Sequence, residues 1–296
     1  MARKVLKYVV LAVIVVNVII ITYVFLGGSM PPPTPLPNPN GYDDFVKAGQ
    51  MVKGNATLDY GTLNREDLAS LVVTNAEVLK LVRLGLTRKS REPVDYSTNY
   101  SMRLMSDLAS FKRLAYLFAA EGRLEELNGH PDDAAESYLD GIRFSQELSR
   151  GGLITSMLVC IADEHIETIP LQWLPNSLNA AKCRKVARVL ESIDAEEEPI
   201  ANFVEQERLW RRKMYGLQGQ IERLINFRAH QKSMDGVVAR VQANQLRRRG
   251  MILAFAARAY ELEKGKLPQS AADLVPDYLK AVPKDPVTGK DLGLGQ

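Results

Sequence analysis

A run of apolar residues between Tyr8 and Leu26 constrains this chain more than any other feature of its sequence. About 19 residues in a helix rise roughly 28 Å, which matches the hydrocarbon thickness of a bilayer. Asn17 and Thr22 interrupt the run, but a central asparagine costs about 2 kcal/mol and the surrounding apolar side chains outweigh it. We therefore expect residues 8–26 to form a transmembrane helix whose partner is the lipid bilayer.

The basic residues around this run predict its direction. Arg3, Lys4 and Lys7 precede it, and the next basic residue is Lys47. Because the flank that is richer in lysine and arginine stays in the cytoplasm, residues 1–7 should form a cytoplasmic tail and the rest of the chain should be exported. The predicted location is the cell (inner) membrane, with a single span and a periplasmic body.

A cleaved signal peptide is the main alternative to a retained signal anchor. Gly27 and Ser29 are small residues that could precede a cleavage site. The apolar part of a signal peptide is about 7 to 15 residues long, however, which is shorter than this run. The length therefore favours retention in the membrane.

Prolines dominate the segment from Met30 to Asn40. They lack the N–H groups that helices and sheets need, so this composition predicts a polyproline II conformation. At about 3.1 Å per residue, ten such residues extend roughly 30 Å. We predict that residues 27–42 form a linker that holds the body away from the lipid. A ligand for a domain that binds Pro-rich segments is the alternative.

Helical periodicity prevails in residues 43–241, which we expect to form a mainly α-helical domain of helical hairpins. The pattern predicts one helix from Asn64 to Gly85 and a polar loop over residues 87–101. A second long helix should end at Asn128-Gly129, a favoured stop.

Further signals divide the rest of this domain. Pro131 is suited to the first turn of a helix. Another helix is predicted from Leu153 to Ile169, closed by Pro170, and Ser177 could cap the next one.

Charge and cysteine content exclude several classes of function. The formal net charge is +3, which gives no long-range attraction for nucleic acid, so we expect no nucleic-acid partner. Two cysteines, Cys160 and Cys183, cannot build a disulfide framework or a four-cysteine zinc site. They flank a turn near residues 170–175, so a single disulfide between them is possible. The favoured interpretation is two buried apolar thiols.

One cluster holds most of the candidate catalytic or metal-ligating groups: Asp163, Glu164, His165 and Glu167. A metal needs three or four converging ligands, and one helix does not aim all four side chains at one point. We treat them as weak candidates and favour a solvated helix face. The same interpretation applies to the basic runs at residues 211–213 and 247–249. No cofactor is expected.

Residues 115–148 resemble a single tetratricopeptide unit. Gly122, Ala134, Tyr138 and Gly141 occupy positions where that family places small, alanine and aromatic residues. The resemblance implies two antiparallel helices packed closely through these residues, and a groove that holds a peptide is one hypothesis it supports. Plain helix packing is the favoured alternative.

Residues 242–296 are expected to form a long helix that ends at Gly265, followed by a small helix–loop module. Residues 250–292 resemble the region after the long helix in type II secretion major pseudopilins, and similar tails of uncharacterised bacterial envelope proteins. The residues that carry this resemblance are Tyr260, Gly265, Pro268, Asp273, Tyr278, Pro283, Asp285 and Pro286. It implies a compact packing unit linked to envelope assembly. Unlike pseudopilins, the chain has no acidic residue in its apolar run and ends before a calcium loop, so no calcium ligand is assigned to Asp285 or Asp291.

These features favour a membrane-anchored, non-catalytic interaction or scaffold protein of the envelope, with a protein partner there. The resemblance of the tail implies a link to a secretion or pilus-like assembly. The alternative is an extracytoplasmic hydrolase or metal-dependent enzyme whose site assembles only in three dimensions. The sequence leaves the identity of the partner and the oligomeric state open.

Overall fold

The computed structural model describes the backbone of residues 2–25, 34–54 and 60–295, and the side chains of these except 2–6, 19–25, 217–224 and 227. In this part of the chain the secondary structure is helical, and the only β-pairing is a single antiparallel bridge between Lys284 and Asp291. The mainly α-helical fold class is therefore confirmed.

The first helix, α1 (Ala2–Phe25), contains most of the apolar run. The side chains described in it, from Lys7 to Val18, are all exposed. No helix presents, among the side chains that the structure describes, an apolar stretch long enough to cross a membrane. Part of the predicted span (the side chains of 19–25 and all of residue 26) and residues 27–33 of the predicted linker lie outside the described residues.

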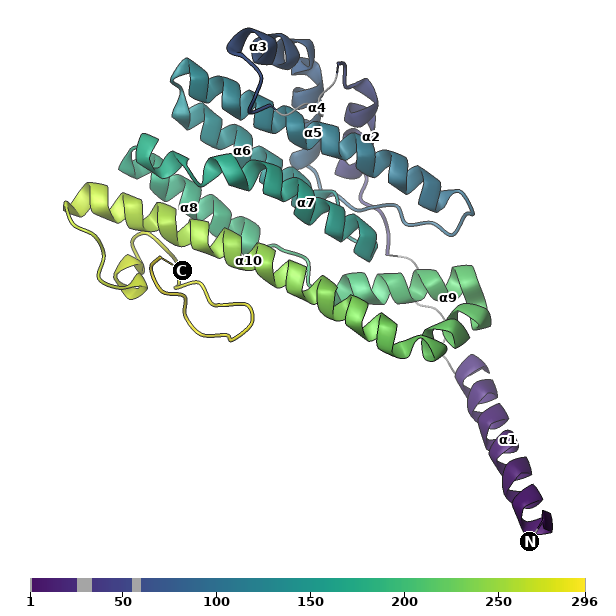
Figure 1. Ribbon diagram of the computed structural model, residues 1–296. Coiled ribbons are helices and arrows are strands. Elements are labelled where there is room, and N and C mark those ends of the chain that lie inside the picture. The colour runs from purple at the N-terminus through teal and green to yellow at the C-terminus, as the bar shows by residue number, and fades with distance from the viewer. Residues whose placement is uncertain (1, 26–33, 55–59, 296) are drawn as a thin grey trace.

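Stacked helices in two layers build the body (Figure 1). Helices α5, α7 and α10 lie side by side in one layer, and α4, α6 and α8 lie side by side in the other. The helices after α1 are α2 (Gly41–Met51), α3 (Arg65–Thr74), α4 (Ala76–Leu86), α5 (Tyr100–Asn128), α6 (Pro131–Glu147), α7 (Ile154–Leu171), α8 (Ala180–Ala195), α9 (Ile200–Ile225) and α10 (Phe227–Lys264).

Glycine and proline set several helix ends as predicted. Gly129 ends α5 in the left-handed conformation (φ 79°), and Pro131 begins α6 with Asp132 and Asp133 in its first turn. Gly265 ends α10 in the same way (φ 68°). A positive φ is accessible to glycine at little cost, so these stops are local properties of the sequence.

The helix predicted from Asn64 to Gly85 is instead two helices, α3 and α4, that meet at Asn75. The Asn75 side chain is fully buried, accepts a hydrogen bond from the Lys53 amide (2.8 Å) and donates to the carbonyl oxygens of Lys53 (3.0 Å) and Leu71 (2.9 Å). The two bonds to Lys53, which is distant in sequence, stabilise the break, and the local sequence does not reveal it.

The body begins earlier than the predicted linker boundary at residue 42. Asn40 caps α2 and accepts hydrogen bonds from the amides of Tyr42 (3.3 Å) and Arg91 (2.9 Å). Tyr42 and Phe45 are buried in a cluster with Phe111 and other side chains of α4 to α7. Residues 41 and 42 therefore belong to the folded body.

Three other helix boundaries differ from the prediction. Asn179, not Ser177, caps α8 by accepting from the Lys182 amide (2.9 Å). Helix α7 ends at Leu171, one residue beyond Pro170, and the Ile166 carbonyl that proline cannot bond accepts instead from the Tyr60 hydroxyl (3.1 Å). Helix α10 starts at Phe227, well before residue 242.

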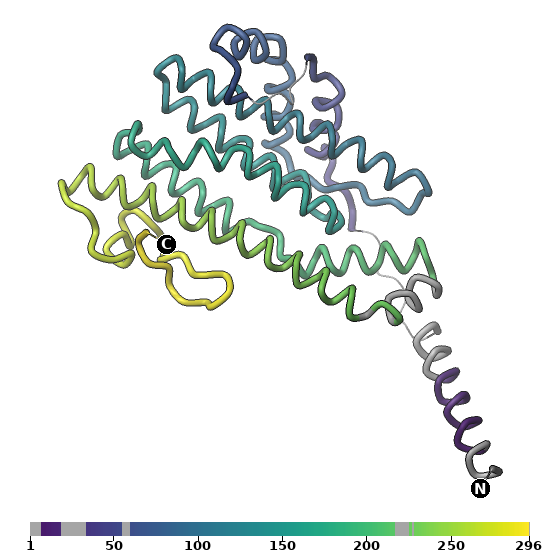
Figure 2. Tube along the Cα trace, in the orientation of Figure 1, coloured from purple at the N-terminus to yellow at the C-terminus, as the bar shows by residue number. Residues whose placement is uncertain are grey.

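After α10 the chain turns back and packs beside that helix (Figure 2). A capping box follows the turn, with Ser270 and Asp273 satisfying each other's backbone amides. The short helix that it begins is only one 3₁₀ turn, η2 (Ala271–Leu274). Leu274, Tyr278 and Leu279 are nevertheless buried against α8 and α10. The module therefore completes the hydrophobic core at this end of the body.

Candidate functional site

The acidic cluster on α7 is buried, so the prediction of a solvated face was wrong for three of its four residues. Asp163, Glu164 and Glu167 are 1%, 3% and 0% exposed, and His165 alone points to solvent. The reason is tertiary: α7 lies between α5 and α10 and also packs on α6, so most of its surface is covered. The helix separates these carboxylates into two environments.

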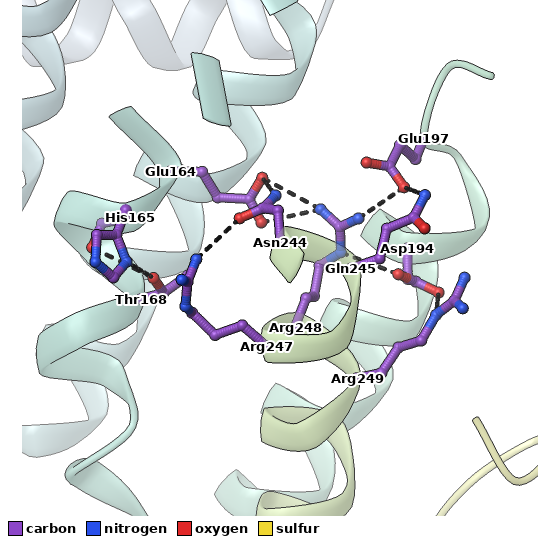
Figure 3. Close-up of polar contacts among 10 residues, drawn as sticks. All are labelled: Glu164, His165, Thr168, Asp194, Glu197, Asn244, Gln245, Arg247, Arg248 and Arg249. Carbon is purple, nitrogen blue, oxygen red and sulfur yellow. Dashed lines mark hydrogen bonds and ion pairs between the residues drawn. The ribbon is translucent and has the colours of Figure 1, made fainter. Parts of the chain in front are cut away.

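Glu164 faces α10 and joins a network around Arg248 (Figure 3). Arg248 is fully buried, although the run at residues 247–249 was predicted to be solvated. Its Nη1 lies 2.9 Å from Glu164 Oε1, its Nε 3.1 Å from Asp194 Oδ1, and its Nη2 2.9 Å from Glu197 Oε2. Asn244 Nδ2 also donates to Glu164 Oε2 (2.9 Å). One guanidinium therefore links α7, α8 and the segment before α9 to α10.

The electrostatic balance of this network indicates a structural role. Burial raises the pKa of Glu164, and Arg248 opposes this shift. Burial alone would lower the pKa of Arg248, but Glu164, Glu197 and Asp194 raise it above its ordinary value. The guanidinium therefore stays charged, and its removal would leave buried carboxylates uncompensated, which typically costs about 3–5 kcal/mol.

Asp163 and Glu167 lie elsewhere on α7. The Glu167 side chain packs against Gly141 of α6 so closely that a Cβ built on Gly141 would be 2.4 Å from Glu167 Cγ. Among the described residues, the two carboxylate oxygens of Glu167 have no hydrogen-bond partner. Asp163 Oδ2 also has none among them. Burial raises the pKa of Asp163 to about 7, and raises that of Glu167 well above its ordinary value. Burial without a hydrogen-bond partner favours the protonated form of both carboxyl groups.

An open groove lies between α6 and α8, with a volume of about 510 Å³. The two helices run in the same direction, because Lys185 Nζ reaches Glu136 (2.5 Å) near their first turns and Arg150 Nη1 reaches the Glu196 carbonyl (3.0 Å) near their last. The groove is lined by Leu86, Arg143, Gln146, Glu147, Arg150, Ala181, Arg184, Lys185, Arg188, Val189, Ser192, Ile193 and Glu196.

Gln146 connects this groove to the buried network. With its amide oriented to satisfy both atoms, it donates to the Ile193 carbonyl (3.1 Å) and accepts from Arg248 Nη1 (2.5 Å). The wall of the groove is therefore fixed by the same guanidinium that holds α7, α8 and α10 together. A rigid wall is what a binding surface needs in order to limit the entropy lost on binding.

Basic side chains outnumber acidic ones in the groove. The five cations are Arg143, Arg150, Arg184, Lys185 and Arg188, and the two carboxylates are Glu147 and Glu196. Several of the cations pair with acids on the same or a neighbouring helix, for example Arg143 with Asp140 (3.2 Å). Such partly exposed pairs are each worth about 0–1 kcal/mol, so an anionic ligand can compete for these cations.

A second, smaller pocket of about 40 Å³ shares Gln146 with the groove. Ser149, Cys160, Glu164 and Glu198 are among the residues that line it. This is space for about one water molecule in polar surroundings.

The two cysteines are free and buried in different hydrophobic clusters. Burial raises the pKa of the Cys183 thiol to about 11, and raises that of Cys160 above its ordinary value. The structure therefore agrees with two buried thiols and does not pair them in a disulfide.

The tetratricopeptide-like residues lie where α5 meets its neighbours. Gly122 contacts the Tyr138 ring, and a Cβ there would be 2.4 Å from Tyr138 Cε1. Tyr138 donates a hydrogen bond to Glu126 (2.5 Å), and Ala134 is fully buried. Gly141 instead faces α7. The residues permit close packing, and the resemblance to the family stays a prediction.

In the C-terminal module, the residues of the predicted motif mainly stabilise turns. Asp273 accepts from the amides of Gln269 and Ser270, and Asp285 accepts from those of Val287 (2.8 Å) and Thr288 (2.7 Å). The remaining positions are structural: the Tyr260 and Tyr278 rings lie 5.4 Å apart, and Pro268 is buried. Pro283 lies in the segment after η2, whereas Pro286 lies in the turn that Asp285 begins.

One further group could offer metal ligands. Atoms of Glu125, His130 and Asp133 lie within 4.8 Å of one another at the turn between α5 and α6. His130 Nδ1 lies 2.9 Å from Glu125 Oε2, and His130 and Asp133 are exposed. A hydrogen bond between His130 and Glu125 beside the start of α6 accounts for this arrangement.

Sequence reasoning did not identify the groove, although a signal was present. Arg184 and Arg188 are four residues apart on α8, which places two cations on one helix face. What sequence could not indicate is that α6 would lie alongside and close a groove. No family model, curated protein or solved structure matches this chain.

Proposed function

We propose that this protein is a membrane-anchored interaction protein of a bacterial envelope, with its helical body outside the cytoplasm. The observation that carries the proposal is the open basic groove between α6 and α8 on a rigidly held helical body. Groove-lining side chains on stacked helices are a common way to hold a partner's peptide. Helix α1, whose described apolar side chains are exposed, supports the anchor.

The proposed location follows from the flanking charge. Basic residues precede the apolar run and favour a cytoplasmic N-terminus, so the body would face the periplasm. The pseudopilin-like tail suggests that the protein works with a secretion or pilus-like assembly. The tail packs against α8 and α10, which is compatible with a purely structural role of the tail within the body.

Site-specific photo-crosslinking in intact membranes tests this function. A photoreactive residue in place of Ser192, an exposed residue that lines the groove, should give a discrete protein adduct that mass spectrometry identifies. The control position is Met102, which is 77% exposed on α5 and does not line the groove. The proposal fails if both positions capture the same abundant proteins, or if neither captures a protein.

A further inference from the structure

We infer that the groove between α6 and α8 binds an extended acidic peptide whose carboxylates lie at every second position and face α8. This inference rests on the proposed interaction function and names the chemistry of its ligand. Five cations and two carboxylates line the groove, so its charge favours an anionic occupant.

The spacing of the cations on α8 selects an extended peptide. Arg184 and Arg188 are four residues apart, so their Cα atoms are separated by about 6 Å along the helix axis. Alternate residues of an extended chain point to the same side and are about 6.6 Å apart. Two carboxylates at positions i and i+2 can therefore meet both guanidinium groups, and Arg–carboxylate pairs can be bidentate.

The wall of the groove opposite α8 disfavours a negative charge at the peptide positions between the two carboxylates. Glu147, the last residue of α6, lies in the sequence between Arg143 of α6 and Arg150 of the turn that follows, and Arg150 Nε is 2.6 Å from Glu147 Oε1. A carboxylate that pointed to the middle of this wall would meet Glu147 and be repelled. The groove should therefore prefer acidic residues alternating with neutral ones over a continuous acidic block of the same charge.

The α8 cations have to exchange existing contacts to meet such a ligand. Arg184 Nη2 lies 2.5 Å from Glu263 Oε2, and its guanidinium lies over the Tyr278 ring, but both members of the ion pair are about one-third exposed, so water screens the pair. Arg188 Nη2 donates to the Asp277 carbonyl at the long distance of 3.4 Å. Lys185 pairs with Glu136, but its side chain is 58% exposed, so water screens this pair. The free energy lost on exchanging these contacts is small compared with that of charge-assisted bonds to a ligand.

Binding of labelled peptides to the full chain in a neutral detergent tests the inference. One nine-residue peptide carries glutamate at alternate positions, a second has the same glutamates in one block, and a third has glutamine instead. The alternating peptide should bind most tightly, and its affinity should fall as the salt concentration rises.

Arg188→Gln should reduce the affinity for the alternating peptide about threefold to tenfold. The matched control is Arg240→Gln, which removes an exposed arginine of α10 outside the groove and should leave the affinity unchanged.

Several outcomes would overturn the inference. The inference is wrong if the alternating and the block peptide bind with equal affinity. It is also wrong if Arg188→Gln leaves the affinity for the alternating peptide unchanged. Glycerol phosphate, an anionic-lipid headgroup, serves as a second probe: if its binding depends on Arg188 while peptide binding does not, the groove is a phosphate site.

If crosslinking captures a partner but the peptides fail these tests, the interaction function stands and the peptide chemistry is wrong. If the peptides behave as expected but crosslinking from the groove captures no protein, the proposed function fails instead.

Discussion

At the scale of single residues, buried ionisable groups are the least expected feature of this protein. Asp163 and Glu167 lie in the interior with oxygens that accept no hydrogen bond from the described residues, whereas Glu164 pairs with Arg248. An unpaired buried carboxylate favours its protonated form, so its burial reduces stability wherever the group must ionise. Two predictions follow from this difference in environment.

Asp163→Asn should stabilise the protein at alkaline pH. Burial raises the pKa of Asp163 from 3.8 to about 7. The folded state then binds more protons than the unfolded state between these values, so stability falls as pH rises from about 4 to about 7. Three pKa units correspond to at most about 4 kcal/mol, which asparagine would recover. Urea unfolding at pH 4 and pH 8 measures this: the gain should appear at pH 8 and vanish at pH 4. The exposed Asp235→Asn is the control, and an equal gain at both pH values would contradict the prediction.

Arg248→Met should destabilise the protein by about 3–5 kcal/mol at neutral pH, because Glu164, Asp194 and Glu197 lose their shared cation inside the fold. Chemical denaturation followed by circular dichroism gives the free energy of unfolding. Arg240→Met, at an exposed position of α10, should change it by less than about 0.5 kcal/mol. Similar losses for both variants would show that the network contributes little.

At the scale of secondary-structure elements, close contacts between helices depend on a few small residues. Gly122 lets the Tyr138 ring of α6 lie directly against α5. Helix ends set by Gly129, Pro131 and Gly265 were predictable, because these residues act through their own backbone. The break at Asn75 was not, since its side chain also bonds both backbone groups of Lys53, 22 residues away.

Gly122→Ala should destabilise the protein by about 1–3 kcal/mol, because the new Cβ would lie 2.4 Å from the Tyr138 ring and force the two helices apart. Gly236 provides a matched control: it lies within α10, and a Cβ there would meet no atom within 4 Å. Gly236→Ala should therefore stabilise by about 0.5–1 kcal/mol through helix propensity. Thermal unfolding of both variants measures the difference, and the same sign for both would contradict the packing argument.

At the scale of the whole molecule, the body holds its own hydrophobic clusters, and these contain none of the described side chains of α1. Folding of the body is therefore expected to be independent of the apolar run. The charge of the groove, by contrast, depends on α6 and α8 lying in parallel, a property of the assembled layers.

Deletion of residues 2–26 should release the protein from membranes and leave its body folded. Sedimentation after alkaline carbonate extraction should find the full chain in the pellet and the shortened chain in the supernatant. Far-ultraviolet circular dichroism and the unfolding midpoint of the shortened chain should match those of the detergent-solubilised full chain. A full chain that is itself extracted, or a shortened chain without helical signal, would contradict this expectation.

The amino-acid sequence alone determined the helical character of this protein, many of its helix ends and the position of its apolar run, because periodicity, glycine and proline act over short distances. It did not determine which charges are buried, since Glu164 and Arg248 are 84 residues apart and meet only when α7 packs on α10. The groove also exists only in the tertiary structure, where α6 and α8 align their cations along a shared surface. Burial and charge proximity are properties of packed helices, and no local pattern specifies them.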